Sequence, residues 1–236
     1  MPTPQLENES KRLEILRSYD LLDTPPEQSF DDFALIASQI CGTPIAAITL
    51  VDEHRQWFKA KVGLTTSETP REQAFCAHTI MTKDMMMVED ATKDVRFADN
   101  PLVTSDPNIR FYAGAPLVDS KGFALGSLCV IDRTPRQLTA EQQRVLQALA
   151  RQVVAQFEFR RISAALAEAV AEITILRDFL PICCHCKSVR NDDGYWSSIE
   201  HYMTSHSGLK LSHGICPVCR VKHYPELAVK PAAGRS

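Results

Sequence analysis

The chain of 236 residues lacks any long apolar run, because no uninterrupted apolar stretch approaches the roughly 18 residues that span a membrane. Its N-terminal segment, MPTPQLENESKR, also lacks the apolar centre of a secretory signal. These absences predict a cytoplasmic protein with no membrane partner. In a reducing cytosol, the eight cysteines are expected to serve metal or redox chemistry rather than a framework of disulfides.

Motifs of the common signalling enzymes are also missing. The sequence has no glycine-rich phosphate loop of the Walker type, no ATP-binding motifs of a histidine kinase and no GGDEF-like signature. We therefore expect that the chain is not an enzyme.

The chain has no strong excess of positive charge. Its formal net charge is −3, which divides into −6 for residues 1–180 and +3 for residues 181–236. A value of +3 is far from the dense basic surface that nucleic-acid binding usually requires. We therefore expect no nucleic-acid partner.

Segments of helical and extended periodicity are present and predict an α+β fold. The helical segments are 7–22, 28–41, 75–81 and one that begins at Thr139. The strand segments are 45–51, 55–62, 85–89, 111–118 and 123–131. The first two and the last two strands are typical of antiparallel hairpins, and a long polar loop, 90–108, lies between the hairpins. Thr139 and Gln142 form the pattern of a capping box.

No proline or glycine interrupts the chain from Thr139 to Leu180, which predicts one long helix. In its second half, apolar residues recur at alternating steps of four and three, the a/d pattern of a two-stranded coiled coil. These stripe residues are Ala155, Phe159, Ile162, Leu166, Ala169, Ile173, Leu176 and Leu180. We therefore predict that residues 155–180 form the coiled coil of a homodimer. The alternative is a helix that lies along its own domain.

Two CxxC pairs follow the helix, Cys183 with Cys186 and Cys216 with Cys219. A CxxC loop holds two thiolates on one side of a tight turn, so two loops can supply the four sulfurs of a tetrahedral Zn²⁺ site. The surrounding segment, 181–227, is too short to bury a self-sufficient core, and a structural metal would supply the missing stability. We predict a zinc module there.

Two alternatives to this ligand set stay open. A CxxC pair can also act as a thiol redox switch. Cys184, His185 or His213 lies close enough in sequence to replace one of the sulfurs. The last residues, 228–236, are expected to form a disordered tail.

Four blocks of the sequence resemble a GAF domain of the type found in bacterial sensor kinases and cyclic-nucleotide-signalling proteins. The blocks are 75–80 (FCAHTI), 88–101 (VEDATKDVRFADNP), 110–117 (RFYAGAPL) and 126–132 (GSLCVID). The resemblance covers about residues 8–160, and we place the domain at 1–154. It implies a central antiparallel sheet of five or six strands with helices packed on one face. On the other face it implies a small-molecule pocket, closed by the long loop.

The cysteine-rich end is similar to tails that follow coiled-coil helices in bacterial GAF, PAS and receiver-domain proteins. The similarity lies in 180–183 (LPIC), 186–190 (CKSVR), 194–196 (GYW) and 212–219 (SHGICPVC). It supports the module and its metal and implies no activity.

The GAF resemblance also suggests residues for the pocket. Cys76 and His78 lie on a segment expected to flank it, and Arg110, Tyr112 and Asp132 are candidates for polar groups that orient a ligand. For Cys76 and His78, ordinary core packing is the alternative. The residues do not identify the ligand.

Together these features predict a regulatory function. The GAF domain would sense a small ligand or a redox state and relay it through the dimeric helix to the zinc module, which would act on a protein partner. One alternative is a thiol-dependent reductase of free methionine sulfoxide, although Cys76 has no apparent resolving partner because Cys41 and Cys129 are expected in the core. The other alternative is a zinc-dependent regulator that binds nucleic acid.

Overall fold

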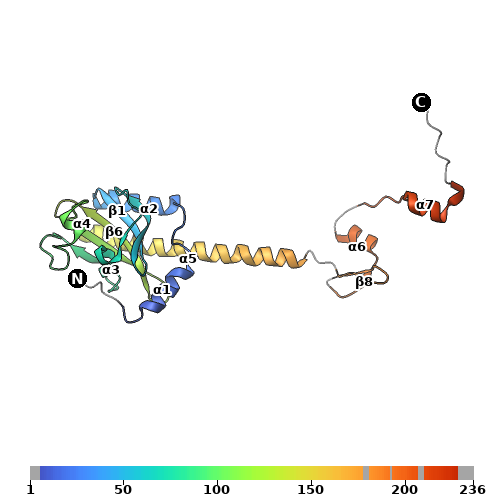
Figure 1. Cartoon of the computed structure of the whole chain (residues 1–236), viewed down its shortest axis with the longest axis horizontal. Helices are drawn as coiled ribbons and strands as arrows, with labels where there is room; N and C mark the ends of the chain where they lie inside the picture. Colours follow the sequence, from blue (N-terminus) through green and yellow to red (C-terminus); the bar gives the residue numbers. More distant parts are fainter. Residues whose placement is uncertain (1–5, 178–180, 192, 207–209, 228–236) are drawn as a thin grey trace, which may run out of the picture. The chain divides into compact units, whose positions relative to one another are not determined.

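The computed structural model describes residues 6–177, 181–191, 193–206 and 210–227, and the chain divides into two compact units, Met1–Ala167 and Glu168–Ser236 (Figure 1). For residues 173–177, 206 and 227 the structure describes the backbone and not the side chains. The predicted tail, 228–236, and the last stripe residue, Leu180, therefore fall outside the described residues.

The first unit is built on a six-stranded antiparallel sheet with the strand order β3-β2-β1-β6-β5-β4. The strands are β1 Ile45–Val51, β2 Arg55–Val62, β3 Glu68–Pro70, β4 Met86–Val88, β5 Phe111–Val118 and β6 Ala124–Asp132. This sheet confirms the predicted α+β class and both predicted hairpins. The sequence did not predict β3, because this edge strand has only three residues, ends at a proline and carries no alternation of buried and exposed positions long enough to recognise.

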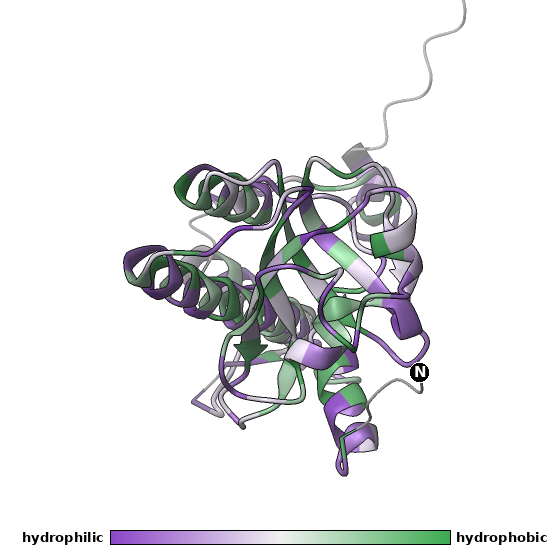
Figure 2. Ribbon diagram, turned by 90° about the vertical axis from the view of Figure 1, so that its left-hand side faces the viewer, coloured by the Kyte–Doolittle hydropathy of each residue, from purple (hydrophilic) through white to green (hydrophobic). Residues whose placement is uncertain are grey.

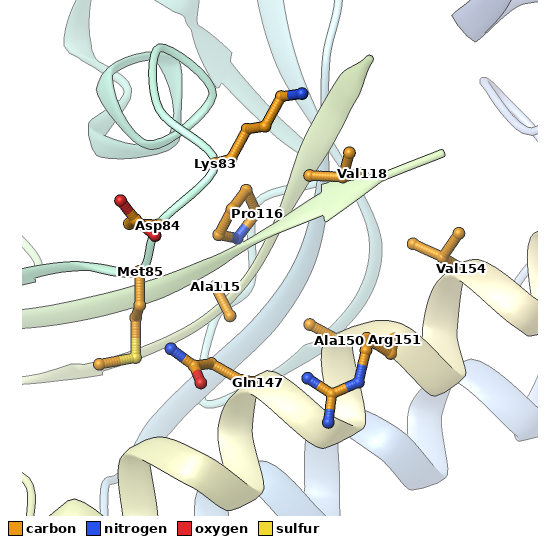
Figure 3. A pocket seen from close by; sticks show the side chains of 10 residues that line it. All are labelled: Lys83, Asp84, Met85, Ala115, Pro116, Val118, Gln147, Ala150, Arg151 and Val154. Atoms are coloured by element: carbon orange, nitrogen blue, oxygen red, sulfur yellow. The ribbon is translucent and has the colours of Figure 1, made fainter. Parts of the chain in front are cut away.

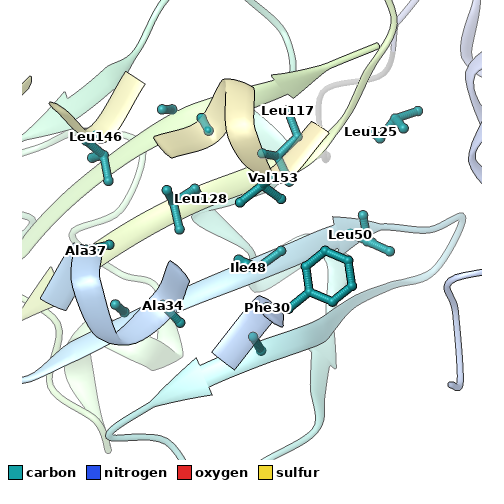
Figure 4. Close-up of a cluster of buried hydrophobic side chains, with 14 of the residues drawn as sticks. Phe30, Ala34, Ala37, Ile48, Leu50, Leu117, Leu125, Leu128, Leu146 and Val153 are labelled. Carbon is teal, nitrogen blue, oxygen red and sulfur yellow. The ribbon is translucent and has the colours of Figure 1, made fainter. Parts of the chain in front are cut away.

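The long helices cover one face of the sheet: α1 Glu9–Ser18, α2 Gln28–Cys41 and the first half of α5 Ala140–Arg177. Phe30 of α2, Ile48 of β1, Leu128 of β6 and Val153 of α5 are buried together between helices and sheet (Figure 4). The helices carry hydrophobic residues next to hydrophilic ones around their circumference, as expected for elements between a core and solvent (Figure 2). Gly42 ends α2 as predicted, with a left-handed φ of 62°.

The opposite face of the sheet is covered by short elements. They are the 3₁₀ turn η1 Arg71–Gln73, the helices α3 Phe75–Thr79 and α4 Pro101–Thr104, and the long loop around α4. Helices therefore lie on both faces, which corrects the expectation of helices on one face alone. The reason is that the loop, predicted as polar, buries Phe97, Val103 and Ile109 against the sheet.

Helix α5 starts at the predicted capping box. The backbone N–H of Gln142 donates to Thr139 Oγ1 at 3.2 Å, and the backbone N–H of Thr139 donates to Gln142 Oε1 at 3.0 Å. The helix then runs without interruption to Arg177 and crosses from the first unit into the second.

The second unit contains a small hairpin and short helices. Its elements after α5 are β7 Val189–Arg190, β8 Trp196–Ser197, α6 Ile199–His206, α7 Pro217–His223 and the 3₁₀ turn η2 Pro225–Leu227. Across the part of the chain that the structure describes, no helix has both the length and the apolar character needed to cross a bilayer.

A buried ion cluster fastens α1 to the sheet. Glu9 accepts hydrogen bonds from Arg12 at 2.6 and 3.0 Å and from Arg71 Nη1 at 2.6 Å, while Arg71 also donates to the backbone oxygen of Asp52 at 3.0 Å. Both arginines are buried. Burial raises the pKa of Glu9, but the hydrogen bonds from the two arginines outweigh burial and lower this pKa to about 2.

We expect Glu9→Gln to lower the free energy of unfolding by about 3 kcal/mol, because it leaves two buried guanidinium groups without a carboxylate. Urea unfolding followed by circular dichroism measures this change. Glu14→Gln is the matched control, since Glu14 pairs with Lys11 on the exposed side of the same helix, and it should leave the unfolding midpoint nearly unchanged. An equal effect of the two substitutions would contradict the cluster's role.

The effect of Glu9→Gln should also depend on pH. The folded-state pKa of Glu9 is about 2 against an ordinary value of 4.5. A carboxylate with a lowered pKa stabilises the folded state above its ordinary pKa and loses this contribution as the pH falls through its folded pKa. The difference between wild type and variant should therefore be complete above pH 4.5 and shrink toward pH 2.

Candidate functional site

A cavity of about 60 Å³ lies on the α3 face of the sheet, where the resemblance implied a ligand pocket. Its walls come from β2, β3, β5, β6, α3 and the loops that follow β2 and surround α4. The lining residues are Gln56, Phe58, Leu64, Thr66, Thr69, Phe75, Cys76, Leu102, Pro107, Ile109, Tyr112 and Ile131. The cavity has room for water, but ligand pockets usually measure about 300–1,000 Å³. A ligand must therefore be small or must widen the cavity.

Tyr112 lines this cavity and is fully buried. Its hydroxyl lies 2.7 Å from Thr79 Oγ1 and 3.3 Å from Ser127 Oγ, and it donates to Cys76 Sγ at 3.3 Å. Burial, followed by the nearby thiols, raises the pKa of Tyr112 well above its usual value, so the phenol stays neutral. Gly114 makes room for it, because a Cβ at that position would lie 2.1 Å from the Tyr112 hydroxyl oxygen.

Cys76 lies beside a second buried thiol. The side chain of Cys129 in β6 approaches it with a distance of 3.9 Å between the two sulfur atoms. Cys129 is in the core, as expected, and it places beside Cys76 a second thiol that was not apparent from the sequence. The sequence carried one usable signal, because both cysteines lie in blocks that resemble the GAF domain.

Two polar atoms of the cavity wall have no hydrogen-bond partner in the described part of the chain, Gln56 Oε1 and Thr69 Oγ1. The two residues face each other across β2 and β3. A buried polar atom without a partner costs about 1–3 kcal/mol. A ligand with N–H or O–H groups would supply the missing hydrogen bonds. Sequence reasoning missed both residues, since nothing in a strand pattern shows which polar side chain lacks a partner.

His78 and Arg110, both predicted as ligand contacts, do not line the cavity. The His78 ring meets Phe97 edge-on, with 4.9 Å between ring centroids. Burial, with a smaller effect from Arg96, lowers the pKa of His78. Arg110 donates to the backbone oxygen of Val103 at 2.8 Å and so holds the loop that carries α4.

Asp132, the fifth predicted contact, also has a local role. Its carboxylate accepts hydrogen bonds from the backbone and hydroxyl of Thr134 at 3.0 and 3.1 Å, and it pairs with Arg136 at 2.5 Å. These contacts shape the turn after β6. Of the five predicted residues, the structure thus brings Cys76 and Tyr112 together in the cavity wall.

A larger hollow of about 450 Å³ lies between α5, β5 and the segment before β4 (Figure 3). Its lining residues are Lys83, Asp84, Met85, Ala115, Pro116, Val118, Gln147, Ala150, Arg151 and Val154. None of the predicted ligand residues lies there. The cavity at Tyr112 therefore remains the candidate ligand site.

The first cysteine pair lies in a tight loop before β7. The backbone N–H of Cys183 donates to Ser188 O at 2.8 Å, and that of Lys187 donates to Cys183 O at 3.0 Å. Cys186 Sγ lies 3.3 Å from Ser188 Oγ. Hydrogen bonds from the side chain and backbone of Ser188, followed by one from Cys183, lower the pKa of Cys186 to about 7. A large thiolate fraction near neutral pH suits a metal ligand.

The second pair lies at the start of α7. Cys216 is the N-cap of this helix, and its sulfur accepts a hydrogen bond from the backbone N–H of Cys219 at 3.4 Å. This bond and one from the Cys219 thiol lower the pKa of Cys216. In each CxxC motif, local hydrogen bonds therefore hold the two thiols close together.

The two pairs are not brought together in the structure. Among the described residues, no group of three or more His, Cys, Asp or Glu side chains lies close enough to hold a metal ion. The donor chemistry fits Zn²⁺, since both pairs offer sulfur ligands supported by backbone N–H groups. The zinc site stays a prediction.

The stripe residues of α5 are exposed wherever the structure describes their side chains. Phe159, Ile162 and Leu166 have exposed fractions of 64%, 59% and 63%, and Ala155 and Ala169 are exposed as well. The side chains of the stripe positions 173 and 176 lie outside the description. The first unit therefore leaves its own stripe residues Phe159, Ile162 and Leu166 uncovered, which is evidence against a helix that lies along its own domain.

Comparisons with known proteins agree with this architecture. A family model for the GAF domain matches residues 25–157. The chain is 44% identical over 159 residues to a cyclic di-GMP phosphodiesterase of Pseudomonas aeruginosa. The aligned residues are 67% of this chain but only 27% of that protein.

Two solved structures have the same fold at low sequence identity. The GAF domain of a phosphoenolpyruvate-protein phosphotransferase from Coxiella burnetii has a TM-score of 0.51 at 16% identity, over 67% of this chain and 99% of that one. A bacteriophytochrome from R. palustris has a TM-score of 0.51 at 10% identity, over 73% of this chain and 42% of that one. The family match spans more than half of the chain, from α2 through the sheet to Phe157 of α5, so the chain belongs to the GAF domain family.

Proposed function

We propose that this chain is a non-catalytic bacterial signal-transduction protein in the cytoplasm, in which the GAF domain senses a small ligand or a redox state. The signal would pass along a dimeric α5 to a zinc-binding output module that acts on a protein partner. One observation carries the proposal: α5 is a single helix that begins in the core of the GAF domain and continues into the cysteine-rich unit.

Strands β5 and β6 connect the cavity to this helix. Tyr112 and Ile131 line the cavity, while Leu128 and Val130, which point to the other face, belong to the core that includes Val153 of α5. A ligand that shifts these strands would change the surface on which the helix packs. Packed helices have alternative arrangements of similar energy, so a small displacement can select between them.

The exposed stripe fits a second copy of the same helix. Residues Leu146, Ala150, Val153 and Phe157 are buried against the domain. At about 100° per residue, the stripe through Phe159, Ile162 and Leu166 lies about 180° around the helix from that buried face. Its 4-3 spacing is the a/d pattern that a like helix complements.

We expect the full chain to be a dimer at micromolar concentration, with about twice the monomer mass of 26.4 kDa. The double variant Ile162→Glu with Leu166→Glu should be monomeric, because it places charges in the seam. Light scattering measures both masses. Ala164→Glu is the control, since it adds a charge at an exposed position on the opposite side of the helix. A monomeric wild type would refute the relay.

Zinc would be held by Cys183, Cys186, Cys216 and Cys219, and it would supply the stability that this unit lacks. Support comes from its apolar side chains, many of which are exposed in the described residues: Ile182, Tyr195, Trp196, Ile215, Val218 and Val221. Zinc-finger peptides gain about 10–16 kcal/mol from the metal.

Elemental analysis of the reduced full chain should find one zinc ion per chain. The variants Cys186→Ser and Cys219→Ser should lose it, and chelation should raise the rate of proteolysis within residues 181–227. Cys184→Ser should keep the metal and serves as the control. If the purified chain holds no metal and resists proteolysis under chelation, the prediction of a zinc module is wrong.

The cavity would take a small ligand that donates hydrogen bonds to Gln56 and Thr69. A cyclic dinucleotide is much larger than about 60 Å³, so the name of the Pseudomonas relative does not identify the ligand. We propose that the region shared with that relative senses a small ligand and does not hydrolyse cyclic di-GMP.

Two threonines of the cavity wall, Thr66 exposed and Thr69 half-buried, give a test. Thr66 Oγ1 donates to Glu68 O at 2.7 Å, whereas Thr69 Oγ1 has no partner among the described residues. In protein stripped of ligand by unfolding and dialysis, Thr66→Val should cost about 1 kcal/mol, whereas Thr69→Val should be neutral or stabilising. Urea unfolding compares the two. Equal destabilisation would show that the Thr69 hydroxyl is already satisfied.

A further inference from the structure

Two buried thiols face each other between α3 and the sheet. Cys76 of α3 and Cys129 of β6 have exposed fractions of 2% and 1%, and their sulfur atoms are 3.9 Å apart. This is van der Waals contact, whereas a disulfide needs a sulfur–sulfur distance of about 2.05 Å. To form the bond, the two sulfurs must approach each other by about 1.9 Å.

Only one of these thiols lines the cavity. Cys76 lies in the wall, and Cys129 does not. A volume of about 60 Å³ admits molecules of the size of water or hydrogen peroxide. A small oxidant that enters the cavity therefore meets Cys76 first.

The surroundings give the two sulfurs different roles. Burial opposes ionisation of Cys76, but hydrogen bonds from Cys129, Ser127, Thr49 and Tyr112 outweigh it and lower the pKa of Cys76 to about 7. The hydrogen bond to Cys76, followed by burial, raises the pKa of Cys129 well above its usual value. Cys76 is the nucleophile because it lines the cavity, and Cys129, with its sulfur 3.9 Å away, is the second thiol.

We propose that Cys76 and Cys129 are a peroxide-reactive pair that forms a reversible disulfide within the GAF domain. In the first step the Cys76 thiolate attacks hydrogen peroxide, an S–O bond forms and the O–O bond breaks. The products are a sulfenic acid on Cys76 and hydroxide, which takes up the proton lost by Cys76 and becomes water.

In the second step the Cys129 sulfur attacks the Cys76 sulfenic sulfur. The S–S bond forms, the S–O bond breaks, and the Cys129 proton leaves with the hydroxyl group as water. Two thiols thus give two electrons to one peroxide and yield one disulfide and two waters. An external dithiol reverses the reaction.

The disulfide would alter the cavity wall. It would draw α3 toward β6, displace the sulfur that accepts from Tyr112, and, by removing the Cys129 hydrogen, end the hydrogen bond of 3.6 Å from Cys129 Sγ to Ala47 O. The regulatory meaning of this change rests on the proposed sensory function, but the formation of the bond does not. The test therefore reads the bond itself and neither the dimer nor the metal.

The experiment exposes the reduced full chain to hydrogen peroxide, blocks the remaining thiols under denaturing conditions and maps the peptides by mass spectrometry. We expect a linked pair of peptides that contain Cys76 and Cys129, lighter by two hydrogens than the reduced pair and absent after treatment with a dithiol. Recovery of both cysteines as blocked thiols, under oxidation that consumes the CxxC pairs, would overturn the proposal.

Variants separate the two steps. In Cys129→Ala the sulfenic acid on Cys76 has no partner, so a sulfenic-acid reagent should label Cys76 more than in wild type. In Cys76→Ala, Cys129 should remain a thiol. Cys41→Ala is the control, because Cys41 is buried in the core on the other face of the sheet, and it should leave the Cys76–Cys129 link unchanged. Wild-type mapping decides the question even if a variant fails to fold.

Discussion

Strands β5 and β6 are inner strands of the sheet, and both of their faces are buried. Successive side chains of a strand point to opposite faces, so they point alternately toward α5 and toward the cavity. Tyr112, Cys129 and Ile131 belong to the cavity face, while Leu128 and Val130 belong to the helix face. Close packing on both faces means that neither can change without the other, since protein interiors hold few voids and transmit strain. The cavity, the thiol pair and the position of α5 all depend on this two-sided burial.

Helix α5 carries two apolar stripes with different partners. Leu146, Val153 and Phe157 meet the sheet, whereas Phe159, Ile162 and Leu166 face the other way and are exposed. One domain can bury only one side of a helix. A helix that is apolar on opposite sides therefore keeps one apolar side exposed unless a second surface covers it. The exposed second stripe is the basis of the proposed dimer.

Buried polar groups distinguish structural positions from candidate functional ones. Asp132 and Arg110 are satisfied by neighbours close in sequence, and Glu9 is satisfied by Arg12 and Arg71, so these groups hold the fold. Among the described residues, buried atoms without a partner occur in Arg12, Arg71 and Arg136 as well as in Gln56 and Thr69, but of these only Gln56 and Thr69 line the cavity. Their unpartnered atoms are therefore the ones that a ligand in the cavity could satisfy.

The amino-acid sequence by itself determined the local structure. Periodicity predicted α2 and both hairpins nearly to the residue, and Thr139 with Gln142 predicted the start of α5, because these signals act between neighbours in the chain. The stripe on α5 and the two CxxC pairs were likewise recognised from the spacing of their residues in the sequence. Only the tertiary structure decided that Cys129 lies against Cys76 and that Arg71 shares Glu9 with Arg12. It also decided that the Gln56 side-chain oxygen has no partner among the described residues. These contacts join residues that are far apart in sequence, and they depend on sheet register and on which face each element covers, which no local pattern specifies.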